Sequence, residues 1–327
     1  MPLKIGEVTL RYGLMLAPMA GYSDRAMRRI CREMGAEYTV SEMVSAKALV
    51  YRDRKTAPLA RLTNDELPAA VQLFGSEPEI LAEAARMAER GACGGARPSA
   101  IDLNFGCPVR KITGNGEGSA LMRTPQRIEQ ITAAVCGAVK IPVTVKLRAG
   151  WDENSRNAAE CARAAEAGGA SVICVHGRTR NEFYSGSADL GIIREAVEAV
   201  SVPVVGNGDV RDGASARRML DETGCAALMS GRGAIGNPFV FEEIRASLAA
   251  QSWQPPTLAE RIETGLRQLR YAIMDKGEET AVLESRKALA AYIGGVRGAA
   301  AVRAAIHTAQ SERELIEIVR EFLRTVQ

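Results

Sequence analysis

Cys107 is the residue best suited to chemistry, because its neighbours set it apart from the other cysteines. It stands in Asn104-Phe105-Gly106-Cys107-Pro108, whereas most of the others lie in apolar stretches typical of small buried residues. A thiol can act as a nucleophile, a metal ligand or a general acid. A metal site is not predicted, because no two cysteines have C-x-x-C spacing and the chain has only two histidines. His176 could serve as a base for the thiol, so the nucleophile and acid roles both stay open.

Three further polar side chains close apolar runs. Lys146 lies in Val143-Thr144-Val145-Lys146-Leu147-Arg148, and His176 ends Val172-Ile173-Cys174-Val175-His176. A charge inside an apolar strand is costly unless it faces a partner, and an anionic cofactor would supply one. Gln72, near the end of a third run, could pair with the edge of a heterocycle. These residues together favour a bound anionic heterocycle.

Two short glycine-rich segments could hold a phosphate. They are Gly206-Asn207-Gly208-Asp209 and Ser230-Gly231-Arg232-Gly233. Small residues let backbone N–H groups approach a phosphate, and Arg232 adds positive charge. Barrels often bind phosphate between the loops that follow their seventh and eighth strands, which is where these segments fall.

The elements that must position these residues are short apolar runs that alternate with amphipathic stretches. Their spacing of roughly 24 to 42 residues is that of βα units. Eight units favour a (β/α)8 barrel over a Rossmann sheet, because Ala17-Pro18-Met19-Ala20-Gly21 does not supply G-x-G-x-x-G. The predicted strands are Leu14–Ala17, Tyr38–Ser41, Ala70–Phe74, Ile101–Asn104, Val143–Leu147, Val172–His176, Val204–Asn207 and Ala227–Ser230.

The pattern changes near Gln251-Ser252-Trp253-Gln254-Pro255-Pro256, which is typical of a linker. Only helical stretches follow, so we predict a barrel domain over residues 1–250 and a helical domain over 256–327. Thr257 with Glu260, and Ser311 with Glu314, predict the starts of the first and last of these helices. The predicted helices are Leu258–Met274, Thr280–Gly294, Ala299–Thr308 and Ser311–Thr325.

Composition indicates an ordinary globular protein. Of the 327 residues, 46% are hydrophobic and 25% are charged, and the net charge is only +3. No apolar run approaches the ~18 residues that a membrane-spanning helix needs. We therefore expect a cytoplasmic protein that does not bind membranes, and the sequence implies no protein partner.

The motifs together resemble the tRNA-dihydrouridine synthases, particularly the bacterial B-type. Asn-x-Gly-Cys-Pro and His-Gly-Arg-Thr are the most specific of the matching segments, which span the barrel in the family's order. The segments are Ala17-Pro18-Met19-Ala20-Gly21-Tyr22-Ser23-Asp24, Ser41-Glu42-Met43, Gln72-Leu73-Phe74-Gly75, Asp102-Leu103-Asn104-Phe105-Gly106-Cys107-Pro108, Val145-Lys146, His176-Gly177-Arg178-Thr179, Gly206-Asn207-Gly208-Asp209, Gly231-Arg232-Gly233 and Arg286-Lys287-Ala288-Leu289-Ala290-Ala291-Tyr292-Ile293.

The resemblance implies a reductase that converts specific uridines of tRNA to dihydrouridine, with FMN as cofactor and NADPH as reductant. It makes Cys107 the proton donor, a role that suits a thiol because its ordinary pKa near ~8.5 leaves it protonated at neutral pH. It assigns the flavin ring to Pro18, Met19, Ala20, Gln72, Lys146 and His176, and the ribityl phosphate to Asn207, Gly208, Asp209, Gly231 and Arg232. Substrate contacts are expected from Asn104, Arg178, Arg286 and Lys287.

The helical tail is where the resemblance places RNA binding. From Ser285 to Ser311 it carries Arg286, Lys287, Arg297, Arg303 and His307 with no acidic residue, so one face could be basic. Two other functions stay open. One is a flavin barrel that acts on a small molecule, like dihydroorotate dehydrogenases or enone reductases, and the other is a non-catalytic RNA-binding protein with a vestigial flavin site.

Overall fold

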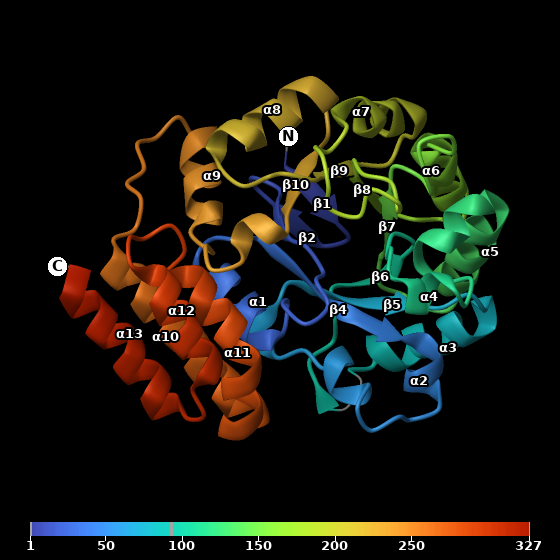
Figure 1. The fold of residues 1–327 in the computed structure, drawn as a ribbon. Helices are drawn as coiled ribbons and strands as arrows, with labels where there is room; N and C mark the ends of the chain where they lie inside the picture. Colours follow the sequence, from blue (N-terminus) through green and yellow to red (C-terminus); the bar gives the residue numbers. More distant parts are fainter. Residues whose placement is uncertain (1, 92–93, 327) are drawn as a thin grey trace.

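The computed structural model describes residues 2–91 and 94–326, and its centre is a closed barrel of eight parallel strands (Figure 1). The strands follow one another round the barrel in chain order, and β10 pairs with β3 to close it. This arrangement confirms the predicted (β/α)8 fold. The strands are β3 (Leu14–Leu16), β4 (Tyr38–Ser45), β5 (Ala69–Phe74), β6 (Ala100–Asn104), β7 (Val143–Arg148), β8 (Val172–His176), β9 (Val204–Asn207) and β10 (Ala227–Ser230).

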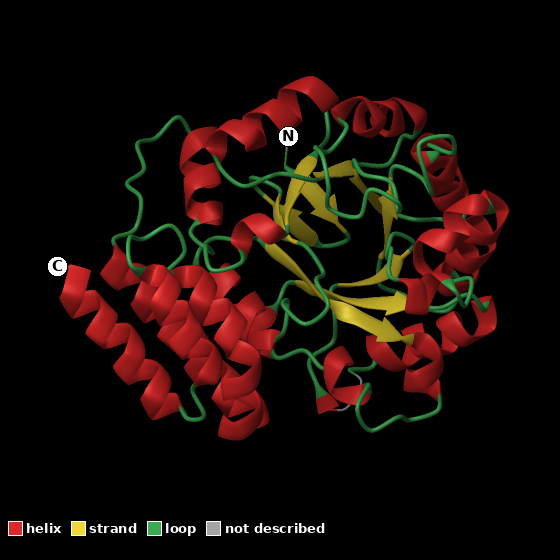
Figure 2. Cartoon of the chain, viewed as in Figure 1, coloured by secondary structure: helices red, strands yellow, loops and turns green. Residues whose placement is uncertain are grey.

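Helices surround the barrel, as Figure 2 shows. Most lie between consecutive strands, as the repeating βα units predict, whereas α9 follows the last strand and was not among the predicted elements. The helices are α1 (Arg25–Glu33), α2 (Ala46–Val50), α3 (Pro78–Glu89), α4 (Arg110–Thr113), α5 (Pro125–Cys136), α6 (Ala158–Ala167), α7 (Leu190–Ala199), α8 (Gly213–Thr223) and α9 (Val240–Leu248).

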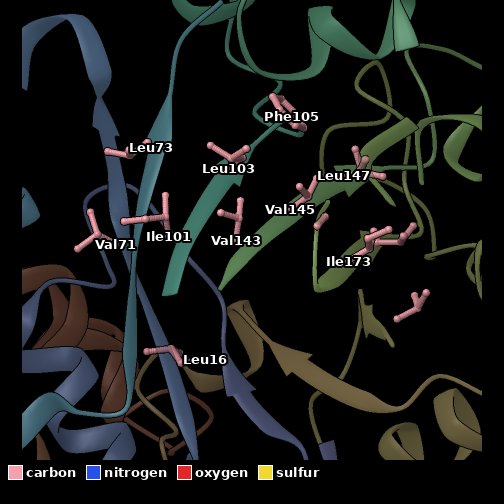
Figure 3. Close-up of a cluster of buried hydrophobic side chains, with 14 of the residues drawn as sticks. Leu16, Val71, Leu73, Ile101, Leu103, Phe105, Val143, Val145, Leu147 and Ile173 are labelled. Carbon is pink, nitrogen blue, oxygen red and sulfur yellow. The ribbon is translucent and has the colours of Figure 1, made fainter. Parts of the chain in front are cut away.

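The alternation of side chains along each strand separates the core from the site. In β7, Val143, Val145 and Leu147 are buried in the hydrophobic cluster that includes residues of the surrounding helices (Figure 3). Successive side chains of a strand point to opposite faces, so Lys146 and Arg148 face the inside of the barrel. β7 thus supplies apolar side chains to the layer between barrel and helices and polar side chains to the barrel interior.

An N-terminal hairpin covers the amino end of the barrel. Strands β1 (Leu3–Ile5) and β2 (Val8–Leu10) pair antiparallel, and Leu3, Ile5 and Leu10 are at most 2% exposed. They belong to the same hydrophobic cluster as the residues that begin the barrel strands, such as Tyr38. The hairpin was not among the predicted elements, because three-residue strands give too short a pattern.

Four helices follow the segment that was predicted to be a linker: α10 (Leu258–Lys276), α11 (Glu278–Tyr292), α12 (Ala299–Thr308) and α13 (Glu312–Val326). They share a hydrophobic cluster of their own, which includes Leu266, Leu289 and Phe322. Thr257 and Glu260 form the predicted reciprocal cap at the start of α10. At the start of α13, the Ser311 hydroxyl accepts the Glu314 N–H, but the Glu314 carboxylate accepts from Gln310 N–H rather than from Ser311.

The four C-terminal helices pack on the barrel through α1, which contacts α10. At this contact Arg25 pairs with Asp275 at 3.0 Å and Lys276 pairs with Asp24 at 2.7 Å. In the described part of the chain, no helix combines the length and the apolar character needed to cross a membrane.

Candidate active site

A chain of hydrogen bonds runs from inside the barrel to Cys107. The Asp102 carboxylate accepts from Thr144 Oγ1 at 2.5 Å and from Gln72 Nε2 at 2.6 Å. Gln72 Oε1 accepts from Asn104 Nδ2 at 2.8 Å, and Asn104 Oδ1 accepts from the Cys107 N–H at 2.9 Å. These hydrogen bonds therefore fix the backbone of Cys107 through side chains of the three neighbouring strands β5, β6 and β7, of which Asn104 in β6 makes the direct contact.

Burial raises the pKa of Asp102 to about 6, against the two hydrogen bonds that favour its charged form. A buried carboxylate with a raised pKa is typical of functional sites, where burial is retained despite its cost. The carboxylate is only 4% exposed, so it acts on the site through its partners and does not face a bound molecule.

Cys107 lies just beyond β6 and is 8% exposed. Its carbonyl accepts from the Ser119 hydroxyl at 2.9 Å, which ties the loop that follows to the cysteine. Burial raises the pKa of the Cys107 thiol, and the Val109 N–H and the positive charge of Arg148 oppose this shift only in part. The thiol is therefore protonated at neutral pH, as a proton donor requires.

The strands β7, β8 and β9 bring three predicted flavin residues together. Lys146 Nζ donates to Asn207 Oδ1 at 2.8 Å, and Asn207 Nδ2 donates to the Met229 carbonyl at 2.8 Å. Burial lowers the pKa of Lys146. Burial also lowers the pKa of His176 well below its usual value, helped by surrounding cations such as Lys146 and Arg148. The imidazole is thus neutral, and the positive charges beside it favour the binding of an anion.

Asp209 forms an ion-pair cluster with Arg178 and with Arg232 of the second glycine-rich segment, at the same end of the barrel. The Asp209 carboxylate accepts from Arg178 at 2.7 Å and from Arg232 at 3.3 Å. Because both carboxylate oxygens already face arginines, Asp209 can reach a phosphate only with its backbone N–H. Its φ of +54° and the φ of +122° at Gly208 turn this backbone sharply.

The backbone of these turns offers N–H donors to a phosphate. Among the described residues, no acceptor bonds the N–H groups of Gly208, Asp209, Arg232 and Gly233. A Cβ at Gly208 would come within 2.5 Å of Ala188 Cβ and 3.0 Å of His176 Cδ2, so only glycine fits there. Free N–H groups that converge beside an arginine are a typical phosphate cradle.

Pro18, Met19 and Ala20 lie in the loop that joins β3 to α1. The Met19 N–H donates to the Ser23 hydroxyl at 2.7 Å, which fixes this loop. A Cβ placed on Gly231 would be 3.5 Å from Met19 Sδ, so the loop borders the phosphate cradle. The structure therefore brings the two predicted ends of the flavin site next to each other.

Two predicted substrate contacts have other partners in the structure. Asn104 uses its amide to bond Gln72 and the Cys107 backbone, so it positions Cys107. Arg178 is 1% exposed, and it donates to Asp209 and to the carbonyls of Ser185 and Gly186. Because these donors are occupied inside the protein, Arg178 fixes the loop after β8 and does not face an RNA.

The two predicted contacts in the helical region differ from each other. Arg286 Nε donates to the Ala309 carbonyl at 2.8 Å, so its guanidinium caps the end of α12. Lys287 is exposed, and its Nζ lies 4.3 Å from the centre of the Tyr22 ring. Lys287 thus reaches from α11 to the loop of the barrel mouth, whereas Arg286 turns inward.

Arg148 is a site residue that was not predicted. It is 3% exposed, and it donates to the Gly106 carbonyl at 2.8 Å beside Cys107 and to the Thr179 carbonyl at 2.9 Å in the loop after β8. Its position two residues after Lys146, on the same face of one strand, was the signal for it. Within the described residues there is no cluster of three or more potential metal ligands.

The fold is that of a (β/α)8-barrel enzyme, and such enzymes carry their active sites at the carboxyl ends of the strands, where Cys107, Lys146 and the glycine-rich turns lie. The family model described as "Dihydrouridine synthase (Dus)" matches residues 15–327. A probable tRNA-dihydrouridine synthase of Rickettsia conorii is 38% identical, over 99% of this chain and 97% of that protein. The tRNA-dihydrouridine synthase B of Pseudomonas aeruginosa is also 38% identical, over 98% and 95%.

Two solved structures share the fold. An amine oxidase (HisD) from Pseudomonas geniculata N1 has a TM-score of 0.58 at 18% identity, over 76% of this chain and 49% of its own. A 2-naphthoyl-CoA reductase has a TM-score of 0.58 at 11% identity, over 76% of this chain and 52% of its own. On the family match and the curated relatives, the chain belongs to the dihydrouridine synthase family, whose members are flavin-dependent oxidoreductases.

Proposed function

We propose that this enzyme reduces the C5=C6 bond of specific uridines in tRNA to 5,6-dihydrouridine, with FMN as cofactor, NADPH as reductant and Cys107 as proton donor. The observation that carries the proposal is the buried Cys107, whose backbone is held by Asn104 and Ser119 at the mouth of a barrel beside the glycine-rich turns. The relatives named as tRNA-dihydrouridine synthases, which match nearly the whole chain, support the same substrate.

The residues around the mouth fit a flavin mononucleotide. Gly208, Asp209, Gly231 and Arg232 would hold its phosphate, the first two and Arg232 with backbone N–H groups that have no acceptor among the described residues. Pro18, Met19 and Ala20 would line one side of the ring. Lys146 and Asn207 would face its pyrimidine side, with neutral His176 beside them. Gln72 is 0% exposed, and its amide nitrogen and oxygen bond to Asp102 and Asn104, so it supports the site by positioning these two residues.

When bound, the flavin would supply the hydride that adds to C6 of the uracil. Addition at C6 leaves negative charge at C5 and on the C4 carbonyl oxygen. Cys107 then gives its proton to C5, and the thiolate that remains is stabilised by the Val109 N–H and by the positive charge of Arg148. A proton from water regenerates the thiol. The hydride and the proton together account for both hydrogens of the product.

The uridine must leave its stack in the RNA to reach the mouth, which costs a few kcal/mol. Contacts to the rest of the tRNA must offset this cost. The exposed cations of the helical region, Lys287, Arg297, Arg303 and His307, would supply part of them through phosphate contacts.

The test is to purify the protein, measure its flavin content, and incubate it with NADPH and an unmodified tRNA transcript. We expect bound FMN, and dihydrouridine in the transcript by mass spectrometry. Free uridine at the same concentration serves as the control for a small-molecule reductase, and we expect no turnover with it. A protein without flavin, or turnover of free uridine but not of tRNA, would contradict the proposal.

A further inference from the structure

Two loops at the carboxyl ends of β7 and β8 carry aromatic rings beside arginines: half-buried Trp151 in the first, and exposed Phe183 and Tyr184 in the second. In the first loop, the Trp151 ring has the guanidinium carbons of Arg180 at 4.6 Å and of Arg123 at 5.2 Å from its centre. In the second loop, Phe183 is 42% exposed and Tyr184 is 47% exposed. We call Trp151, Phe183 and Tyr184, with Arg123 and Arg180, the aromatic rim.

The loop after β8 is held so that its rings point outward. Phe183 and Tyr184 meet edge to face at 5.4 Å, and Arg232 lies 4.7 Å from the centre of the Tyr184 ring. Buried Arg148 donates to the carbonyl of Phe183, and buried Arg178 to that of Ser185. Phe183 has a φ of +56°, a left-handed conformation that is unfavourable for an aromatic residue and persists only where the surroundings impose it.

The Trp151 loop of the aromatic rim lies on the opposite side of the barrel mouth from the helical region, whereas Tyr184 reaches Arg232 after β10. In the closed barrel, β7 is four strands away from β3, which is half of the circle. The C-terminal helices pack against α1, which directly follows β3. Figure 1 shows the same arrangement, with α10 to α13 on one side and β7, β8 and α6 on the other.

Two arginines of the aromatic rim, Arg123 and Arg180, offer donors that could contact a nucleic-acid backbone. Exposed Arg123 has no hydrogen-bond acceptor among the described residues, and Arg180 has a buried Nε without one. Two acidic neighbours are engaged locally, since Asp152 accepts from Ser155 at 2.6 Å and Glu182 accepts from the Thr179 N–H at 2.6 Å. Glu153 is exposed, so the loops carry three acids against the arginines Arg123, Arg180 and Arg232.

We propose that the aromatic rim stacks unpaired bases of the tRNA next to the uridine that enters the barrel, while Arg123 and Arg180 contact the adjoining phosphates. The inference rests on the proposed function, because a uridine that leaves its stack deprives its neighbours of a stacking partner. Aromatic side chains replace that partner, and arginines between them follow the backbone, as in proteins that bind single strands. RNA bound between the rim and the helical region would be held on both sides of the reacting base.

The two half-reactions of the holoenzyme separate this role from a role in binding the reductant. Anaerobic bleaching of the flavin by NADPH involves no RNA. Reoxidation of the reduced enzyme by tRNA involves no NADPH. We expect Tyr184→Ala and Trp151→Ala each to raise the tRNA concentration for half-maximal reoxidation about ten-fold, as expected for the loss of one stacked base. The rate of bleaching by NADPH and its concentration dependence stay unchanged.

Matched variants control for other effects. Tyr184→Phe and Trp151→Phe keep a ring for stacking, so they should restore most of the affinity. Tyr51→Ala removes a side chain that is 69% exposed but lies beyond α2, outside the rim, and should change neither half-reaction. Tyr184 contacts Arg232, so Tyr184→Ala could lose flavin. In that case the two half-reactions of Trp151→Ala alone test the inference.

Unchanged reoxidation by tRNA in both alanine variants would overturn the inference. An equal loss in both half-reactions, or a loss confined to bleaching by NADPH, would also overturn it and would assign the rim to the reductant. If the unsubstituted holoenzyme bleaches with NADPH but is not reoxidised by tRNA, the proposed function itself fails, and that result is visible before any variant is made.

Discussion

The two ends of the barrel interior are made by the same strands and yet differ in almost every physical property. In β8, the inward side chains pass from Val172 at the amino end to His176 at the carboxyl end, and in β6 they pass from Ala100 through Asp102 to Asn104. The amino end is filled with hydrocarbon and covered by the β1–β2 hairpin. The carboxyl end is filled with charges and amides whose hydrogen bonds lead to Cys107.

This difference indicates that one end of the barrel stabilises the fold and the other end carries the functional site. Apolar side chains at the amino end stabilise the fold, because their burial removes hydrocarbon from water. The buried charges at the carboxyl end cost stability and are retained for binding and proton transfer. Substitutions at the two ends should therefore affect different measurements.

The largest effect is expected at the mouth. Cys107→Ala should lower dihydrouridine formation at least ~100-fold, because a positioned general acid contributes 10²–10⁴-fold to such a step. Flavin content and thermal unfolding should change little. Cys136→Ala, which removes a half-buried thiol at the far end of α5, is the matched control and should keep full activity. A Cys107→Ala enzyme that works at the unsubstituted rate would remove the chemical distinction between the two ends.

The opposite effect is expected at the amino end. Ile5 is 1% exposed, so Ile5→Ala should lower the free energy of unfolding by about 2–4 kcal/mol in chemical denaturation. The turnover number of the folded enzyme should be unchanged. Lys4→Ala alters the exposed neighbour on the same strand and should leave stability unchanged within about 0.5 kcal/mol. Loss of turnover in folded Ile5→Ala enzyme would show that the two ends are coupled.

The pH dependence of stability should reveal the cost of the polar interior. Because the pKa of Asp102 is raised from 3.8 to about 6, folding favours its protonated form. Its favourable contribution to stability is present below the unfolded pKa and is lost as pH rises through about 6. Asp102→Asn should remove this loss, so between acid and neutral pH its stability should fall by about 3 kcal/mol less than that of the unsubstituted enzyme. Parallel pH profiles for the two proteins would contradict the assignment.

The smallest effect is expected where the helical region meets the mouth. Lys287→Ala should weaken tRNA binding a few-fold and lower the slope of log affinity against log salt by about one, since one phosphate contact is lost. Arg286→Ala serves as the contrast, because its guanidinium caps Ala309 and its loss should lower stability without changing the salt slope. Equal salt slopes for both variants and the unsubstituted enzyme would argue against a phosphate contact from Lys287.

The barrel could be predicted because its strands leave strong local patterns. Strands buried on one face by helices and on the other by the barrel interior give apolar runs that end in glycine or polar residues, and β8 and β9 begin and end at the predicted residues. β4 continues to Ser45, four residues beyond its predicted end, because the polar residues Ser41 and Glu42 interrupt the apolar run. A register shift between Val40 and Met43 accompanies this irregular segment.

The sequence predicts which residues belong to the site but not which partners their side chains contact. Lys146 and His176 could be recognised because a polar residue inside an apolar run is unusual. The inward turn of Arg286 and the burial of Arg178 depend on partners 23 and 31 positions away in the sequence. No local pattern encodes such contacts, so both residues were expected to face the RNA. The position of Arg148 two residues after Lys146, on the same face of β7, was a local signal, but its partner loops come together only in the closed barrel.

One single-turnover reaction in deuterated water tests the central claim most directly. The holoenzyme is reduced anaerobically, mixed with an unmodified tRNA transcript, and the product is analysed for dihydrouridine and its deuterium. We predict one dihydrouridine for each flavin reoxidised, with solvent deuterium at C5 from the exchangeable Cys107 thiol and also at C6, because the N5–H of a reduced flavin exchanges with solvent. Reoxidation of the flavin without dihydrouridine, or dihydrouridine without solvent deuterium at C5, would contradict the account.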